Sequence, residues 1–154
     1  MICEKTYTIE ELLASNTAFV GTFGGTSMLP MLKERRDTIV VQPKTQRLKA
    51  LDVALYRVGE KYILHRVIKV LQDGYLIRGD NCYFNEYVKE NAVIGVLTEF
   101  YCGEECISVT DEKYLKYAKK RVKTYPLRRF SYLLTKFPRR IFSWIKRKLK
   151  KKTP

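Results

Sequence analysis

Short runs of β-branched and aromatic residues, separated by tight turn signals, are the feature that most limits how this chain folds. The clearest turn signal is Asp73-Gly74, which lies between an apolar run from Tyr62 to Val70 and a second run from Tyr75 to Arg78. Glycine adopts the positive φ angles of hairpin turns at little steric cost, so an Asp-Gly pair between two such runs is typical of a β-hairpin. The sequence therefore predicts antiparallel strands in a mainly β core.

One short helix and several further strands complete the predicted domain. Thr8 caps the helix, and Glu11 is the reciprocal partner of a capping box three residues later. The helix is expected to end near Ser15 and Asn16. The further strands are predicted over Thr17–Phe23, Thr38–Val41, Val53–Val58 and Ala92–Tyr101.

The net charge of +14 is concentrated in the C-terminal part of the chain. Residues 1–111 hold 13 Lys and Arg against 15 Asp and Glu, whereas residues 112–154 hold 17 against one. We therefore interpret residues 1–111 as a near-neutral globular domain and residues 112–154 as a basic helical extension. Because the domain itself is not basic, we do not expect nucleic acid as its partner.

Apolar residues in the extension recur at steps of three and four, as on one face of a helix that Pro138 interrupts. They are Leu127, Phe130, Leu134, Phe137, Ile141, Ile145 and Leu149. Lys and Arg flank this stripe, a pattern typical of a helix that lies in a membrane interface. We expect the extension to bind an anionic membrane surface, at the cytoplasmic leaflet. The alternatives are a stripe packed on the domain with solvated charges, and binding to nucleic acid or an acidic peptide.

The cysteines are expected to be reduced, partly buried thiols, because no signal peptide precedes the domain. They are Cys3, Cys82, Cys102 and Cys106. Cys102 and Cys106 have a loose metal-like spacing, but no second Cys/His pair completes a zinc site. We expect neither a metal nor a cofactor. The sequence also lacks a run of about 20 apolar residues that would span a membrane.

Ser27 lies in the turn-prone segment Gly24 to Pro30, and His65 is the only histidine of the chain. A serine hydroxyl becomes a good nucleophile when a base removes its proton, and His65 is the one imidazole available for this. A glycine-rich loop lets a substrate approach the backbone, where the Ser27 amide would stabilise an oxyanion. In a strand, His65 shares a face with apolar residues, which fits either a core histidine or a neutral general base.

An acidic residue follows the predicted hairpin. Gly79-Asp80-Asn81 comes directly after the run that the hairpin turns back along the His65 strand. We expect Asp80 at about the level of His65, where a carboxylate would orient the imidazole through its second nitrogen. On spacing alone, a turn-capping aspartate is the simpler interpretation.

Four segments taken together resemble the signal peptidase clan, which also includes the self-cleaving SOS and phage repressors. They are Ser27-Met28-Leu29-Pro30, His65-Arg66-Val67-Ile68, Gly79-Asp80-Asn81 and Val93-Ile94-Gly95-Val96. The bacterial signal peptidases and the repressors carry a lysine base at the position of His65. The histidine here resembles the signal peptidases of the archaeal and endoplasmic-reticulum type. The resemblance implies a Ser27 nucleophile and a His65 general base. It also implies a coiled antiparallel sheet or partial barrel, with the substrate added as a strand beside the one that leads into Ser27.

The chain departs from the pattern of this clan at three places. Glu86 occupies the position of the catalytic aspartate of the histidine type, so either Glu86 or Asp80 is the acid. We favour Asp80, because a glutamate displaces its carboxylate by a methylene. Gly25 replaces a serine that some members carry two residues before the nucleophile. The N-terminal membrane helix of signal peptidases is missing, as in small soluble bacterial peptidases of the clan.

The sequence therefore predicts a serine endopeptidase that cleaves a protein or peptide after a small residue, through an acyl-enzyme on Ser27. Substrate contacts are assigned to Phe23, Gly25, Thr26 and Met28, and the protein is expected in the cytoplasm, peripheral at the inner face of the cell membrane. The alternative is an inactive peptide-binding or regulatory module that the extension recruits to a membrane. A DNA-binding repressor is disfavoured, because the 26 residues before Ser27 contain no helix-turn-helix.

Overall fold

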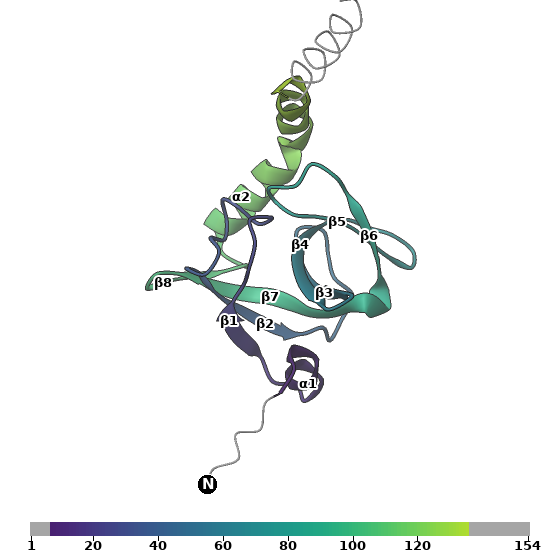
Figure 1. Ribbon diagram of the computed structural model, residues 1–154, viewed down its shortest axis with the longest axis vertical. Coiled ribbons are helices and arrows are strands. Elements are labelled where there is room, and N and C mark those ends of the chain that lie inside the picture. The colour runs from purple at the N-terminus through teal and green to yellow at the C-terminus, as the bar shows by residue number, and fades with distance from the viewer. Residues whose placement is uncertain (1–6, 136–154) are drawn as a thin grey trace, which may run out of the picture. The chain divides into compact units, whose positions relative to one another are not determined.

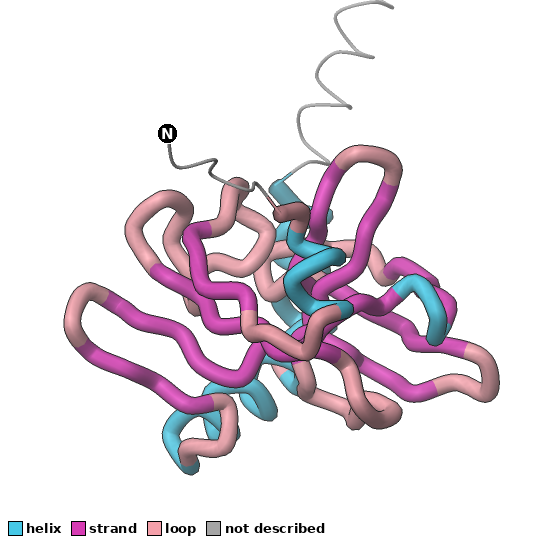
Figure 2. The backbone as a smooth tube through the Cα atoms, turned by 90° about the horizontal axis from the view of Figure 1, so that it is seen from below, coloured by secondary structure: helices cyan, strands magenta, loops and turns pink. Residues whose placement is uncertain are grey.

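The structure, a computed structural model, describes residues 7–135 and contains a mainly β unit built on one eight-stranded antiparallel sheet. The strand order is β1-β2-β7-β3-β4-β5-β6, and β8 pairs with β7 (Figure 1). The sheet is not closed into a barrel, because β1 and β6 stand at the two ends of this order. Figure 2 shows strands and loops making up most of this unit.

The predicted helix and all six predicted strands are present. α1 (Ile9–Ala14) begins with the capping box between Thr8 and Glu11 and has Ser15 as its C-cap. The predicted strands correspond to β1 (Phe19–Thr22), β2 (Thr38–Pro43), β3 (Val53–Val58), β4 (Lys61–Val70), β5 (Gly74–Arg78) and β7 (Val93–Cys102). Their neighbours pair antiparallel throughout, which confirms the prediction of a mainly β, antiparallel core.

Two hairpins place β4, the strand that carries His65, in the interior of the sheet, between β3 and β5. β3 and β4 are joined by Gly59 and Glu60, and Gly59 has a φ of +58°, which favours glycine. β4 and β5 are joined by a turn in which the amide of Leu71 donates to the carbonyl oxygen of Gly74. A Cβ at Gly74 would lie 2.3 Å from the carbonyl oxygen of Val88, so this position needs glycine.

The sequence patterns did not predict the two short strands β6 (Glu86–Lys89) and β8 (Glu105–Ser108). In β6 only Val88 is buried, and in β8 no residue is. Such strands carry no run of apolar residues, so only their pairing with β5 and β7 identifies them. β6 positions Glu86, one of the two candidate acids, opposite Ile77 of β5.

The sheet is buried on both faces along β3. Val53 and Leu55 belong to one apolar cluster, which also contains residues of β2, β7 and both helices of the unit. Ala54 and Tyr56 belong to a second cluster on the opposite face, with residues of β4, β5 and β6. This double burial explains why residues 53–56 of β3 form a continuous run of apolar and aromatic side chains.

The chain divides into two compact units between Val122 and Lys123. α2 (Glu112–Lys123), which the charge pattern assigned to the extension, buries Tyr114 and Ala118 in the first cluster and belongs largely to the sheet unit. A second helix covers residues 125–135. Pro126 lies in the first turn of this helix, where a missing N–H costs no hydrogen bond. A proline inside a continuous helix would break it, which is why α2 ends before this position. The part of the predicted stripe from Phe137 onward, the interruption at Pro138 and Cys3 lie outside the described residues.

Candidate active site

Ser27 lies in the loop between β1 and β2, beside a groove of about 660 Å³. Gly25 has a φ of +97°, a left-handed conformation, and a Cβ there would meet nothing within 4 Å. Both Gly25 and Phe23 line the groove, so a ligand can approach them. Thr26 is exposed. Met28, which the sequence assigned to substrate contact, is fully buried in the first apolar cluster, where it anchors the loop and offers no exposed surface to a ligand.

His65 lies near the middle of β4 and lines the same groove as Ser27. It is opposite Ala54 of β3 and is only 4% exposed. The structure thus brings together the two residues that the sequence paired from positions far apart in the chain. The groove is largely apolar, with Leu55, Tyr62 and Leu64 among its walls.

Gly79 is the point at which the serine loop and the histidine meet. An ideal Cβ at Gly79 would lie 2.7 Å from the carbonyl oxygen of Ser27 and 2.9 Å from Nε2 of His65. Both separations are shorter than real Cβ contacts, so a side chain here would push the loop and the imidazole apart. Only glycine permits this approach, and Nε2 therefore faces the segment that carries Ser27.

Asn81 ties the Gly79 turn to the serine loop. Its backbone amide donates to the carbonyl oxygen of Ser27 at 2.7 Å, and its side-chain Nδ2 donates to the carbonyl oxygen of Thr26 at 3.2 Å. The side-chain bond gives a reason for asparagine as the third residue of the Gly79-Asp80-Asn81 motif, for which the sequence alone offered no role.

Tyr56 and Glu86 determine which nitrogen of His65 carries the proton. The Tyr56 hydroxyl donates its single proton to Oε2 of Glu86 at 2.7 Å. The hydroxyl oxygen of Tyr56 also lies 3.0 Å from Nδ1 of His65. With that proton used, the hydroxyl can only accept from Nδ1–H. Neutral His65 therefore carries its proton on Nδ1 and leaves the Nε2 lone pair free on the side of Ser27, as a general base requires.

Burial and charge act in opposite directions on His65. Burial lowers the pKa of His65 below its ordinary value, whereas the carboxylates of Glu86 and Asp80 raise it; burial prevails. The imidazole is consequently neutral near pH 7. Burial and the neighbouring Glu86 raise the pKa of Tyr56, which keeps its hydroxyl protonated as a donor to Glu86.

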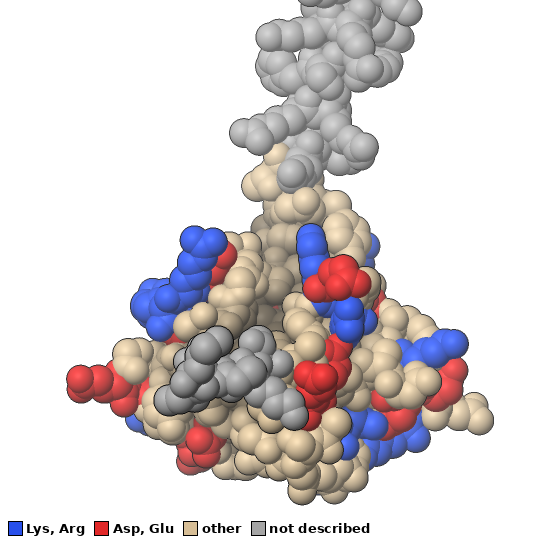
Figure 3. All heavy atoms as spheres, turned by 60° about the horizontal axis from the view of Figure 1, so that its bottom comes forward, with Lys and Arg blue, Asp and Glu red and all other residues tan. Residues whose placement is uncertain are grey.

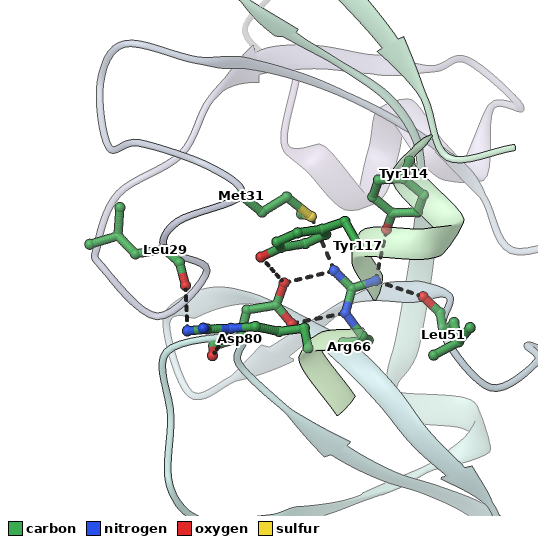
Figure 4. Close-up of polar contacts among 8 residues, drawn as sticks. Leu29, Met31, Leu51, Arg66, Asp80, Tyr114 and Tyr117 are labelled. Carbon is green, nitrogen blue, oxygen red and sulfur yellow. Dashed lines mark hydrogen bonds and ion pairs between the residues drawn. The ribbon is translucent and has the colours of Figure 1, made fainter. Parts of the chain in front are cut away.

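Asp80 is directed to Arg66, as Figure 4 shows. Its two carboxylate oxygens accept from Nε and Nη2 of Arg66 at 2.8 and 2.7 Å, and one of them also accepts from the Tyr117 hydroxyl at 3.0 Å. Glu86 Oε1, in contrast, lies 3.6 Å from Nδ1 of His65. Of the two candidate acids, the geometry therefore favours Glu86. The longer side chain is accommodated because Tyr56 lies between the carboxylate and the imidazole.

Sequence reasoning missed Tyr56. Its position in β3 was predicted, but only the register shows that it is the diagonal cross-strand neighbour of His65. The available signal was a hydroxyl-bearing side chain directly after the apolar residues 53–55 of β3, since a buried tyrosine usually has a hydrogen-bond partner.

Cys82 lines the groove near His65, and burial raises the pKa of its thiol. This favours the uncharged thiol over a reactive thiolate. Over residues 7–135, no cluster of three or more His, Cys, Asp or Glu side chains is arranged to hold a metal ion.

Comparison with known proteins finds no family model that matches the chain and no significantly similar curated protein.

Proposed function

We propose that this protein is a serine endopeptidase in which Ser27 is the nucleophile and Nε2 of His65 is the general base. The observation that carries the proposal is the orientation of His65: Tyr56 holds Nδ1, and Nε2 faces the Ser27 segment across Gly79. Both residues line one groove, as a nucleophile and its base must. The resemblance to the histidine-type signal peptidases supports the same pair.

In the proposed reaction the Ser27 hydroxyl attacks the carbonyl carbon of the scissile bond and gives its proton to His65 Nε2. The imidazolium then passes this proton to the departing amine, leaving an ester on Ser27 that water hydrolyses by the same route. β1 is at the end of the sheet order, so an extended substrate can pair with its outer edge and reach the groove. Cleavage after a small residue is what the clan resemblance implies.

Labelling with a fluorophosphonate tests this proposal without knowledge of the natural substrate. Such a reagent forms a covalent bond with an activated serine, and peptide mapping of the labelled full-length chain identifies the modified residue. Modification of Ser27 supports the proposal, whereas an unlabelled Ser27 contradicts it. Peptide binding at the groove without labelling would favour the alternative, a peptide-binding module of the same fold.

Replacing Glu86 with Gln is expected to move the pH dependence of labelling to lower pH. Labelling needs neutral His65, so its rate rises with pH through the pKa of that residue. The Glu86 carboxylate raises this pKa, and its removal lowers it. Rates measured between about pH 4 and 9, about 2.5 units either side of an ordinary histidine pKa, would give the midpoint.

Glu60→Gln is the matched control, because the Glu60 side chain is 92% exposed on the β3–β4 turn. A midpoint that stays in place or rises in Glu86→Gln would show that Glu86 does not act on His65.

We also propose that residues 112–154 attach the protein to an anionic membrane surface. In the helix over residues 125–135, Leu127, Phe130, Leu133 and Leu134 are between 49% and 68% exposed. Their three- and four-residue spacing places them on one face. Residues 112–154 hold 17 Lys and Arg against one acid. On the face of the sheet unit shown in Figure 3, in contrast, charges of both signs are interspersed. No helix of the described residues is long and apolar enough to span a bilayer.

Replacing Leu127, Phe130 and Leu134 with Ser in the full chain is expected to lower its co-sedimentation with anionic vesicles at least tenfold. Each of these side chains contributes about 1.5–3 kcal/mol when fully buried in an apolar phase, so losing even part of three burials exceeds that factor. Vesicles of phosphatidylcholine alone are the control, and they should bind the unmodified chain more weakly, since each basic residue adds about 1 kcal/mol on an anionic surface. Equal sedimentation of both chains would contradict the proposal.

A further inference from the structure

We infer that Arg121 of α2 is a positioning residue that holds the Ser27 loop against the Gly79–Asp80 turn. Its Nε donates to the backbone carbonyl oxygen of Asp80 at 2.9 Å, and its Nη2 donates to the carbonyl oxygen of Leu29 at 3.3 Å. One planar guanidinium therefore joins two segments that are distant in the sequence. Each of the two segments carries part of the candidate site.

The two joined segments are held together on both sides of Ser27. Asn81 bonds the carbonyl oxygens of Thr26 and Ser27, and Arg121 bonds that of Leu29 two residues later. Gly79 immediately precedes Asp80, and a Cβ at Gly79 would clash with both the Ser27 carbonyl oxygen and Nε2 of His65. A change in the bond from Arg121 to Asp80 thus reaches the Ser27–His65 geometry through one peptide unit.

α2 itself is fixed by a buried polar cluster around Arg66. The Arg66 guanidinium is paired with Asp80 and also donates Nη1 to the Tyr114 hydroxyl at 2.8 Å and to the carbonyl oxygen of Leu51 at 3.0 Å (Figure 4). The Tyr117 hydroxyl donates to Asp80, so two tyrosines of α2 hold this helix to the cluster. Because Tyr114 and Ala118 are also in the apolar core, α2 is a rigid support for Arg121.

This arrangement gives the first part of the basic extension a role that its charge did not indicate. The catalytic consequence rests on the proposed peptidase function, whereas the contact itself is independent of it. A lysine at position 121 would keep the charge, but a single ammonium on a flexible stem lacks the planar fork that reaches both carbonyl oxygens.

Arg121→Ala and Arg121→Lys in the full chain test the inference, with Lys119→Ala as the control. Lys119 is on the same helix, carries the same charge and is exposed. We expect Arg121→Ala to lower the maximal rate of fluorophosphonate labelling at least tenfold, because a misplacement of about 1 Å costs about 10²-fold. The labelling rate should fall less in Arg121→Lys. In both Arg121 variants, the pH midpoint of labelling and the Tm should stay near those of Lys119→Ala.

Amide hydrogen exchange separates a failure of this inference from a failure of the peptidase proposal. Arg121→Ala is expected to speed exchange in residues 24–31 and 79–82 several-fold relative to Lys119→Ala, and to leave β3 and β4 unchanged. That result supports the contact even if Ser27 is never labelled. Unchanged exchange in both segments overturns the inference. Faster exchange combined with unchanged labelling of an active chain overturns the catalytic role. If Arg121→Ala does not fold, Arg121→Lys decides by the same measurements.

Discussion

Ser27→Ala is expected to abolish fluorophosphonate labelling of the full-length protein, and His65→Asn to slow it by about 10⁴-fold or more. Alanine removes the only oxygen that can form the covalent bond in the proposed mechanism. Asparagine still offers Tyr56 a polar partner but cannot take up a proton, so the Ser27 hydroxyl remains a weak nucleophile. Losses of this size are typical when either member of a serine–histidine pair is removed, because the two groups act as a unit.

The two substitutions should also fail to add when combined. Once Ser27 is replaced, His65 has no proton to accept, so the double variant should be as inactive as Ser27→Ala alone. Ser131→Ala is the matched control, since Ser131 is exposed in the helix over residues 125–135 and bonds only locally to Leu127. Labelling that survives in Ser27→Ala, or that proceeds at an unchanged rate in His65→Asn, would contradict the assignment.

Asp80→Ala is expected to destabilise the fold by about 3–5 kcal/mol, the usual cost of removing one partner of a buried ion pair. Arg66 is wholly buried and Asp80 is 4% exposed, so the guanidinium would keep its charge in a site that water does not reach. The Tyr114 hydroxyl and the Leu51 carbonyl oxygen would still bind it but carry no neutralising charge. Urea unfolding of the full chain, followed by tyrosine fluorescence, would measure the difference.

A second change distinguishes an unpaired charge from a general loss of packing. Replacing Arg66 with Met in the Asp80→Ala background removes the stranded charge and should restore part of the lost free energy of unfolding. Glu60→Ala, on an exposed turn, should stay within about 0.5 kcal/mol of the unmodified protein. A loss below 1 kcal/mol in Asp80→Ala would show that the pair contributes little to stability.

Particular residues show why some of the fold was predictable from the sequence and some was not. The turn between β4 and β5 and the helix capped by Thr8 follow from local rules, because turn geometry and capping involve residues a few positions apart. Gly74 itself is required for a non-local reason, the close approach of Val88 in β6. β6 and β8 could not be found in this way. Their residues have little burial of their own, and their backbone bonds depend on strands that other parts of the chain supply.

The choice between Asp80 and Glu86 as the acid of the candidate site also depends on contacts between distant segments. Spacing placed both Asp80 and Glu86 after the hairpin, and side-chain length favoured Asp80. The structure pairs Asp80 with Arg66, the residue next to His65 in β4, whose side chain points to the opposite face of the strand. Glu86 approaches the imidazole instead, through a tyrosine from another strand. One-dimensional spacing does not say which face of a strand a partner will meet.

By itself, the sequence determined the antiparallel β character and the short N-terminal helix, and it predicted that Ser27 and the single histidine act together. These depend on turn chemistry, apolar periodicity and the scarcity of a residue type, all of which are local or compositional properties. Only the tertiary structure decided that Tyr56 sets the tautomer of His65, that Glu86 is the nearer acid and that α2 supports the site through Arg121. Those outcomes depend on strand register and on which buried charges neutralise one another, and both are settled only when distant segments pack together.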